Sequence, residues 1–287
     1  MRITNKFNLP QTIVNALHRP TYSKGGADLS ATELFNSPRI VQLRRMHMDE
    51  IEQDASEMVW SLFGTAIHGV LEHGQGTDHV VEERLSTEID GWKISGAIDL
   101  QTIEGGNITI SDYKTTGAWS VMNSKVEWEI QLNIYAWLVE RVKAMPVSRI
   151  EIVAIIRDWS RRDAQVKEGY PEAPIKALEM VLWPFERRER YILDRIALHS
   201  AAHFSAEVGD ELPECTSEEM WEKPAVWAVK KTGGVRAKVL CLSEQDAKDK
   251  LAELGKGFEI EFRPGERTRC QNYCSVSQFC SQWKSYQ

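Results

Sequence analysis

The chain of 287 residues has few cysteines, no long hydrophobic run and no excess of positive charge. Its longest apolar run, Ile150–Ile156, contains Glu151 and is far too short to cross a bilayer. The net charge of −7 argues against a protein that coats nucleic acid by bulk electrostatics, although a local basic groove is still possible. No charged-then-apolar leader opens the sequence, so we expect a cytoplasmic protein with no membrane partner.

The remaining composition is that of an ordinary globular protein, with 42% hydrophobic and 27% charged residues. This length allows one elaborated domain or a core with a smaller appendage. All five cysteines lie beyond residue 214. In a reducing compartment, clustered cysteines more often bind metal than form disulfides.

Two apolar-rich runs predict a β-hairpin in the first half of the chain. Ile94–Leu100 and Ile108–Tyr113 are joined by a segment that contains Gly105 and Gly106. Glycine tolerates the positive φ that tight turns require, so a Gly-Gly connection is a strong hairpin signal.

This predicted hairpin carries charged residues at the ends of its strands. Asp99 falls near the end of the first strand, and Asp112 and Lys114 fall at the end of the second. Side chains alternate along a strand, so Asp112 and Lys114 share one face and Tyr113 points away. Clustered carboxylates are costly unless they hold something, and their hard oxygens suit Mg²⁺ or Mn²⁺. We therefore expect the catalytic centre here.

The segment Met58–His73 is predicted to be a helix, since its apolar residues recur at helical spacing. The predicted core face consists of Val59, Leu62, Phe63, Ala66, Ile67, Val70 and Leu71. His68 and Glu72 lie one turn apart beside it, either as a partly exposed polar pair or with His68 as a nitrogen ligand of the metal. Gly64 would allow this helix to approach another backbone closely.

Further elements follow from the same patterns. Gln131 and Tyr135 share one stripe of a predicted helix over Val126–Ala144 and need polar partners, from the catalytic groups or from an ordinary buried hydrogen bond. Ser30 and Glu33 form a capping box. The other predicted elements are strands over Val80–Ile89, Glu151–Asp158 and Glu179–Trp183, a helix from Pro184 to Ala206, a hairpin over Trp221–Leu240 and a helix over Ser243–Leu254.

In this order, the motifs resemble the RecB-like branch of the PD-(D/E)xK nuclease superfamily, which includes CRISPR-associated exonucleases and many phage-encoded relatives. The resemblance runs from Ser30 to Tyr135. It is carried by His68 in GTAIHGVLE, Asp99 in GAIDL, Asp112 and Lys114 in SDYKTT, and Gln131 and Tyr135 in QLNIY. Each motif alone is weak, and their occurrence together is specific.

The resemblance implies an α/β fold with a mixed central sheet flanked by helices, and DNA cleavage with Mg²⁺ or Mn²⁺. The metal ligands would be His68, Asp99, Asp112 and the carbonyl of Tyr113. Lys114 would orient or help deprotonate the attacking water. Gln131 and Tyr135 would position the lysine or the DNA backbone, and Glu72 carries over less directly.

The cysteines also resemble this branch, in which three C-terminal cysteines and an upstream one bind a [4Fe–4S] cluster. Here the ligands would be Cys270, Cys274 and Cys280, with Cys215 as the fourth and Cys241 as a buried packing residue. The sequence departs from the pattern, because the first gap is longer by one residue and no cysteine precedes the nuclease motifs. Zinc or unliganded thiols are the alternatives.

From these features we predict an N-terminal helical arm (1–57), a nuclease core (58–206) and a C-terminal region with the second hairpin and the cysteines (207–287). The expected function is a DNA exonuclease of phage or prokaryotic replication, recombination or repair, located in the prokaryotic or phage-infected cytoplasm. A structure-selective or sequence-specific endonuclease and a non-catalytic DNA-binding module are the alternatives. Ring-shaped assemblies occur in the superfamily, so a homo-oligomer is a further possibility.

Overall fold

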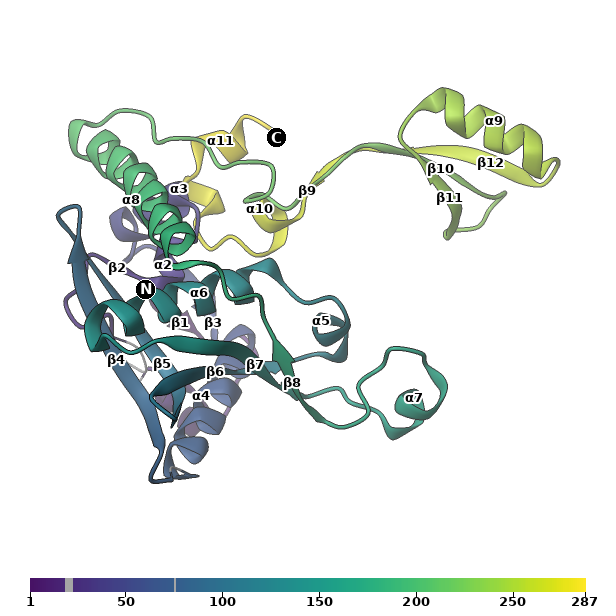
Figure 1. Ribbon diagram of the computed structural model, residues 1–287. Helices are drawn as coiled ribbons and strands as arrows, with labels where there is room; N and C mark the ends of the chain where they lie inside the picture. Colours follow the sequence, from purple (N-terminus) through teal and green to yellow (C-terminus); the bar gives the residue numbers. More distant parts are fainter. Residues whose placement is uncertain (19–22, 75) are drawn as a thin grey trace. The chain divides into compact units, whose positions relative to one another are not determined.

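The computed structural model describes residues 1–18, 23–74 and 76–287. This part of the chain divides into two compact units, Met1–Gln42 with Met48–Leu212, and Leu43–His47 with Pro213–Gln287 (Figure 1). The three-part division at residues 57 and 206 stays a prediction, and residues 19–22 of the predicted arm lie outside the described residues. Among the described residues, no helix is both long enough and apolar enough to span a membrane.

The first unit is built on a mixed sheet of six strands. Its order is β2–β5–β6–β7–β8, and β4 also pairs with β5. The β2–β5 and β6–β7 pairs are parallel, and the other pairs are antiparallel. The strands are β2 (Leu29–Ser30), β4 (His79–Ile89), β5 (Trp92–Glu104), β6 (Asn107–Thr116), β7 (Val147–Ile156) and β8 (Ile175–Glu179). A two-stranded sheet of β1 (Arg2–Thr4) and β3 (Glu52–Asp54) accompanies it.

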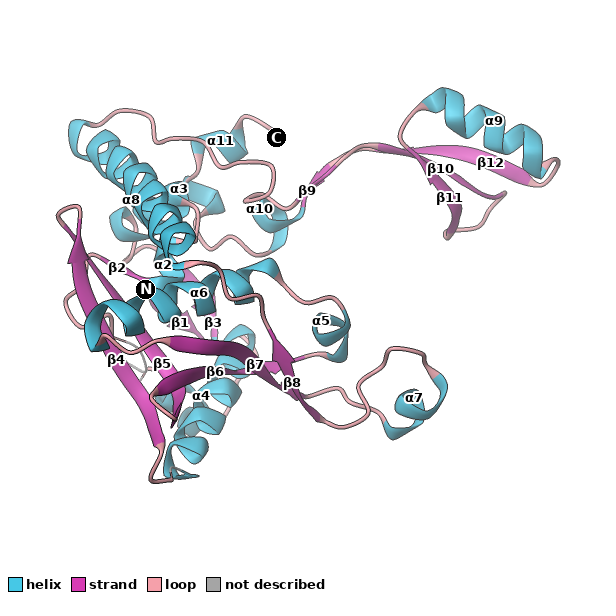
Figure 2. Cartoon of the chain, in the orientation of Figure 1, coloured by secondary structure: helices cyan, strands magenta, loops and turns pink. Residues whose placement is uncertain are grey.

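Helices flank this sheet, which confirms the predicted α/β fold with a mixed central sheet (Figure 2). The helices of residues 1–212 are α1 (Gln11–Leu17), α2 (Ala31–Leu34), α3 (Pro38–Met46), α4 (Val59–Leu71), α5 (Ala118–Met122), α6 (Val126–Lys143), α7 (Arg161–Val166) and α8 (Phe185–Val208), with short 3₁₀ turns η1 (Ala55–Met58) and η2 (Glu72–Gly74). Helix α6 crosses β4, β5, β6 and β7 and contacts α8.

The predicted hairpin is confirmed as β5 and β6. Glu104 pairs with Asn107, so Gly105 and Gly106 form the two-residue turn. Their φ values of 57° and 83° are the left-handed conformation that this turn requires and that glycine adopts without strain. The turn fixes the register of the two strands that carry the aspartates.

Helices α4 and α6 lie on opposite faces of β6. The amide of Gln131 on α6 donates to Asp112, which points to one face of the strand. On α4, a Cβ added at Gly64 would lie 3.4 Å from Oγ1 of Thr115, which points to the other face. The strand is therefore the layer between a helix on each side.

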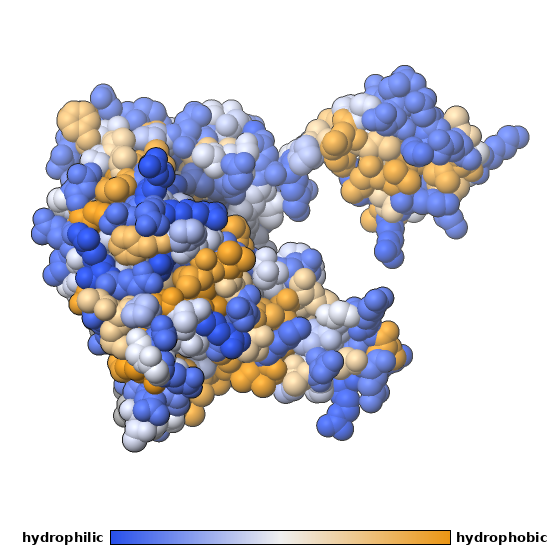
Figure 3. Space-filling model, viewed as in Figure 1, coloured by the Kyte–Doolittle hydropathy of each residue, from blue (hydrophilic) through white to orange (hydrophobic). Residues whose placement is uncertain are grey.

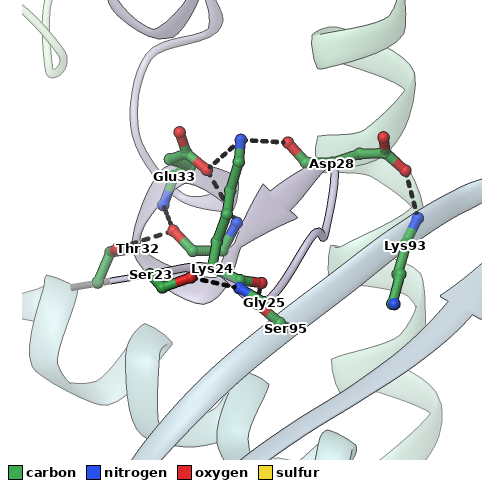
Figure 4. A network of polar contacts seen from close by, with 9 residues as sticks. Ser23, Lys24, Gly25, Asp28, Thr32, Glu33, Lys93 and Ser95 are labelled. Atoms are coloured by element: carbon green, nitrogen blue, oxygen red, sulfur yellow. Dashed lines mark hydrogen bonds and ion pairs between the residues drawn. The ribbon is translucent and has the colours of Figure 1, made fainter.

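A polar network attaches the segment before α2 to β5 (Figure 4). Ser30 and Glu33 form the predicted capping box. The Lys24 ammonium donates to the carbonyl of Asp28 at 3.0 Å and lies 3.5 Å from a carboxylate oxygen of Glu33. The Ser95 hydroxyl of β5 donates to the carbonyl of Lys24, 2.8 Å away. These bonds hold β5 immediately before the segment that carries Asp99.

The predicted core face of α4 is wrong. No residue of this helix is buried, and Val59, Trp60, Phe63 and Val70 are exposed. The helix has the expected apolar spacing, but it packs mainly along β6, and His68 reaches Glu82 of β4 and Asp99 of β5. Periodicity identified the apolar stripe correctly and could not show that little of the protein covers it.

The predicted strand over Glu179–Trp183 is also wrong, because β8 covers Ile175–Glu179. The N–H of Met180 still donates to the carbonyl of Ile150 on β7, and beyond it the backbone bonds to a side chain of α6. The Asn133 amide donates to the carbonyl of Val181 at 2.9 Å and accepts from the N–H of Trp183 at 2.8 Å. The loop predicted over Arg157–Pro174 contains the short helix α7.

The second unit contains a small sheet with one helix. Strand β10 (Val226–Lys231) lies between β11 (Ala237–Cys241) and β12 (Phe258–Arg263), which confirms the second hairpin. Helix α9 (Glu244–Leu254) is capped by Ser243 as predicted, and Cys241 packs in the small core. Apolar side chains also reach the surface of this sheet, including Leu240, Leu242 and Phe262 (Figure 3). The remaining elements are β9 (Glu222–Lys223), β13 (Glu266–Arg267), α10 (Thr268–Asn272), η3 (Ser277–Phe279) and α11 (Ser281–Lys284).

Candidate active site

Three acidic residues occupy one row across β4, β5 and β6. Val81 pairs with Leu100 and Glu83 with Ile98, so Glu82 lies opposite Asp99. The β5–β6 ladder ends at the pair of Leu100 and Ser111. Beyond this pair, the next residue is Asp99 on β5 and Asp112 on β6. The three residues are thus neighbours where β5 and β6 separate, but among the described residues the group of metal-compatible ligand atoms consists of His68, Glu82 and Asp99, and the predicted ligand Asp112 lies outside it.

The strands are irregular at this row. Before Asp99, the even-numbered Gly96 faces α6, since an added Cβ would lie 2.7 Å from the Tyr135 ring. After Asp99, the odd-numbered Gln101 faces α6 and accepts from Lys143 at 3.0 Å. Opposite Asp99, Glu82 has a φ of 50°, which is unusual for a residue with a side chain. The alternation therefore shifts between Asp99 and Gln101, which leaves Asp99 on the α4 side, and strain such as the positive φ of Glu82 is often found at functional sites.

His68 contacts this row from the face of the sheet that α4 covers. Its Nδ1 lies 3.2 Å from Oε1 of Glu82 and 3.6 Å from Oδ1 of Asp99. Its Nε2 lies 3.3 Å from the carbonyl oxygen of Tyr113. Ligand atoms of His68, Glu82 and Asp99 all lie within 4.8 Å of one another, close enough to share a metal ion.

The second carboxylate, Asp112, is held by the α6 side of the sheet. Its Oδ1 accepts a hydrogen bond of 3.1 Å from the amide of Gln131, which also donates to the Tyr135 hydroxyl at 2.7 Å. Its Oδ2 lies 2.5 Å from the Lys114 ammonium. Asp112, Gln131 and Tyr135 are buried. The structure therefore brings together the amide, the phenol, the carboxylate and the lysine that the sequence singled out.

The close carboxylates change the acidity of the site. Burial, and then the negative charge of Asp112, raise the pKa of Asp99 to about 7, against the opposing effects of His68 and Lys114. The hydrogen bond with Glu82, followed by the charge of Asp99, raises the pKa of His68 above its ordinary value. The N–H of Tyr113 donates to Oδ2 of Asp99 at 2.7 Å, which partly compensates the buried carboxylate.

These groups fit a hard divalent cation. Carboxylate oxygens and one imidazole nitrogen are donors that Mg²⁺ and Mn²⁺ accept. A cation between them would offset the repulsion that raises the pKa of Asp99. Oδ2 of Asp112 is also buried and, among the described residues, accepts no hydrogen bond beyond its ion pair with Lys114.

Glu82 is not among the residues predicted from the sequence, and β4 places it beside His68 and Asp99. Glu82 lies in a strand of mixed pattern next to Glu83, and only the β4–β5 register distinguishes the two. The more weakly supported candidate, Glu72, is exposed and follows the end of α4 in η2.

The predicted cysteine ligands lie in the second unit. The Gln282 amide group accepts from the N–H of Cys215 at 2.8 Å and donates to its carbonyl at 3.0 Å, which joins Cys215 to the C-terminal tail. Burial, and then the charges of Cys274 and Cys280, raise the pKa of Cys270. Among the described residues, however, no three cysteine sulfurs lie within 4.8 Å of one another. Metal binding by these residues stays a prediction.

The family comparison agrees with this arrangement. Residues 52–281 match the model of the PD-(D/E)XK nuclease superfamily. The chain belongs to this superfamily. The matched range includes His68 and both aspartates of the row, and membership supports nuclease activity on DNA, which enzymes of the superfamily typically carry out with a divalent metal.

Solved structures give more distant similarities for this PD-(D/E)XK protein. The crystal structure of the protein SSO0001 has a TM-score of 0.45 and 18% identity, over 66% of this chain and 82% of that one. A protein from Eubacterium rectale described as a candidate exonuclease has a TM-score of 0.30 and 12% identity, over 62% of this chain and 65% of that one. The comparison with curated proteins found no match.

Proposed function

We propose that the protein is a Mg²⁺- or Mn²⁺-dependent DNA exonuclease of the RecB-like branch. The observation that carries this proposal is the row of Glu82, Asp99 and Asp112 across three strands, with His68 on one side and Lys114 on the other. A binding module has no need for a lysine beside buried carboxylates, whereas phosphodiester hydrolysis does.

The metal ligands in this proposal are His68, Asp99, Asp112 and the carbonyl of Tyr113, to which the structure adds Glu82. When bound, the cation supplies a water of lowered pKa and offsets negative charge at phosphorus. The carbonyl of Tyr113 lies 3.3 Å from Nε2 of His68, on the same edge of β6 as the N–H that donates to Asp99.

Lys114 is the residue proposed to orient the attacking water. Its ammonium is held by Asp112, so it can donate a hydrogen bond that orients the water and stabilises charge on the phosphate oxygens. Gln131 and Tyr135 act through Asp112, since the Gln131 amide donates to the Asp112 carboxylate and to the Tyr135 hydroxyl. They are positioning residues, which keep the carboxylate in one rotamer.

The exonuclease activity and its place in phage or prokaryotic DNA replication, recombination or repair follow from the motif resemblance. In the same proposal, Cys215, Cys270, Cys274 and Cys280 bind a [4Fe–4S] cluster or zinc, and the bonds of Gln282 to the backbone of Cys215 join this residue to the C-terminal segment that carries the other three. Elemental analysis of anaerobically purified protein tests this, and the absence of both iron and zinc would contradict it.

Digestion of linear DNA with Mg²⁺ or Mn²⁺ tests the catalytic proposal. Asp112→Ala and Lys114→Ala are expected to lower the rate by at least about 100-fold while circular dichroism stays unchanged. Lys176→Ala is the matched control, because Lys176 is an exposed lysine on β8 of the same sheet. Undiminished rates in either active-site variant would refute the proposal.

Circular single-stranded DNA separates the exonuclease from an endonuclease of the same fold. An exonuclease has no end to attack and leaves the circle intact, whereas a structure-selective or sequence-specific endonuclease opens it. A non-catalytic binding module would bind DNA and release no nucleotides with any divalent ion.

A further inference from the structure

Helix α4 presents an exposed aromatic surface beside the candidate active site. Trp60 is 56% exposed and Phe63 is 39% exposed, and both lie on a helix with no buried residue. Exposing large aromatic side chains to water is unfavourable, so neighbouring exposed aromatic residues near a site indicate that a ligand binds there.

Trp60 lies on the same stripe of α4 as the candidate metal ligand. Trp60, Gly64 and His68 are spaced by four residues, which places them on one face of the helix. Gly64 lies against Thr115, and His68 lies against the carbonyl of Tyr113. The stripe therefore follows β6 outward from the site, and Trp60 occupies its outer end.

An arginine brings a positive charge to this outer end. The guanidinium of Arg157 lies 4.2 Å from the centre of the Trp60 ring. The N–H of Arg157 donates to the carbonyl of Thr116 at 2.9 Å, which holds the residue at the end of β6. A flat ring beside a guanidinium offers a stacking surface for a base and a donor for a phosphate.

We propose that Trp60 and Arg157 form a platform that binds unpaired DNA as it enters the active site. This inference rests on the proposed function and names single-stranded DNA as the substrate class. A tryptophan face can stack on a base that is not already stacked and paired in a duplex. With a net charge of −7, the protein gains more from stacking than from a broad phosphate-binding surface.

The spacing gives the length of strand that the platform serves. Eight residues at a rise of 1.5 Å separate Trp60 from His68 by about 12 Å along α4. At about 3.4 Å for each stacked nucleotide, this distance corresponds to three or four nucleotides. A mononucleotide is too short to contact the metal ligands and Trp60 together.

Equilibrium binding of fluorescently labelled oligothymidylate in EDTA tests the platform without cleavage. Trp60→Ala is expected to weaken binding by about 5- to 100-fold, the range that loss of one stacked base produces. Trp60→Phe should retain most of the affinity, because it keeps an aromatic face. Arg157→Gln should weaken binding less and reduce the slope of log affinity against log salt by about one.

Phe204→Ala is the matched control. Phe204 is 63% exposed on α8, the helix that contacts α6 on the opposite side of the sheet from α4, and its removal should leave binding unchanged. Unchanged affinity in Trp60→Ala would overturn the proposal. Equal weakening of blunt-duplex binding by Trp60→Ala would also overturn it. The same holds if sedimentation shows that Trp60→Ala changes only the association of the protein into a dimer.

A small phosphodiester distinguishes this proposal from the catalytic one. Bis(p-nitrophenyl) phosphate is too short to contact Trp60, so Trp60→Ala should hydrolyse it at the wild-type rate while Asp112→Ala does not. If the protein cleaves nothing but Trp60→Ala still weakens oligothymidylate binding, the platform stands and the proposed function fails. If Trp60→Ala slows this small ester as much as long strands, the platform is wrong.

Discussion

Helices α4 and α6 flank the same strand and differ in almost every physical respect. Both are rich in apolar residues, yet ten residues of α6 are buried and none of α4 is. Helix α6 crosses four strands and supplies the hydrogen bonds to Asp112, whereas α4 contacts β6 and supplies His68. One helix holds the site in place, and the other leaves an apolar surface open beside it.

The difference shows what a hydrophobic pattern can and cannot indicate. Spacing at i, i+3 and i+4 locates an apolar stripe, and it contains no information about what covers the stripe. For α6, the sheet and α8 provide the cover. On α4 no residue is buried, and we propose that a substrate strand contacts Trp60 at the outer end of this helix.

The largest expected effect is a difference in unfolding free energy between two tryptophan variants, one on each helix. Trp137 on α6 is fully buried and Trp60 on α4 is 56% exposed. Trp137→Ala should lower the free energy of unfolding by about 3–5 kcal/mol, because it leaves a large cavity. Trp60→Ala should change it by less than about 1 kcal/mol. Urea denaturation measures both, and equal losses would show that α4 is buried in solution.

Asp99→Asn should stabilise the metal-free protein at high pH. The pKa of Asp99 is about 7 in the folded protein against an ordinary value of 3.8, so the folded state disfavours the charged form. The cost is absent below pH 4, grows as the pH rises to about 7 and is constant above that. At about 1.4 kcal/mol for each unit of pKa, the gain at pH 8 is at most about 4 kcal/mol.

Urea denaturation of wild type and Asp99→Asn in EDTA at pH 4, 6 and 8 measures this gain. The variant should match the wild type at pH 4 and exceed it increasingly at pH 6 and 8. Asp28→Asn serves as the control, because Asp28 is exposed and lies just before β2, where its carboxylate accepts from the N–H of Lys93. A gain in Asp99→Asn that is the same at all three pH values would contradict the explanation.

Two glycines provide a smaller and more local comparison. At Gly96, a Cβ would lie 2.7 Å from the Tyr135 ring and 2.9 Å from Leu138, so Gly96→Ala should displace α6 and cost about 1–3 kcal/mol. At Gly64, a Cβ would lie at the ordinary distance of 3.4 Å from Thr115. Gly64→Ala should be neutral or stabilising by up to about 1 kcal/mol, because alanine favours the helix. Thermal unfolding measures both, and a larger loss at Gly64 would contradict the packing described.

The features that the sequence predicted are those set by local chemistry. Gly105 and Gly106 determine the hairpin turn, and the hairpin places Asp99 and Asp112 on adjacent strands. The contact between Gln131 and Tyr135 follows from helical spacing, since they lie one turn apart. The cap of Ser30 on α2 is equally local.

The features that the sequence did not predict depend on partners far along the chain. Glu82 reaches the site only because of the β4–β5 register and a local positive φ, neither of which a strand pattern contains. The segment after Glu179 is not a strand, because Asn133 on α6 satisfies its backbone groups. Both cases involve contacts between elements, which periodicity within one element cannot indicate.

Titration of Mn²⁺ at pH 8, followed by the electron paramagnetic resonance signal of the free ion, tests most directly whether the acidic row is one cation site. The wild type should bind Mn²⁺, and Asp99→Asn and Glu82→Gln should each weaken binding by at least about 10-fold. Glu72→Gln should bind as the wild type does, since Glu72 is exposed beyond the end of α4. Unchanged Mn²⁺ affinity in Asp99→Asn would contradict a cation site at the point where β5 and β6 separate.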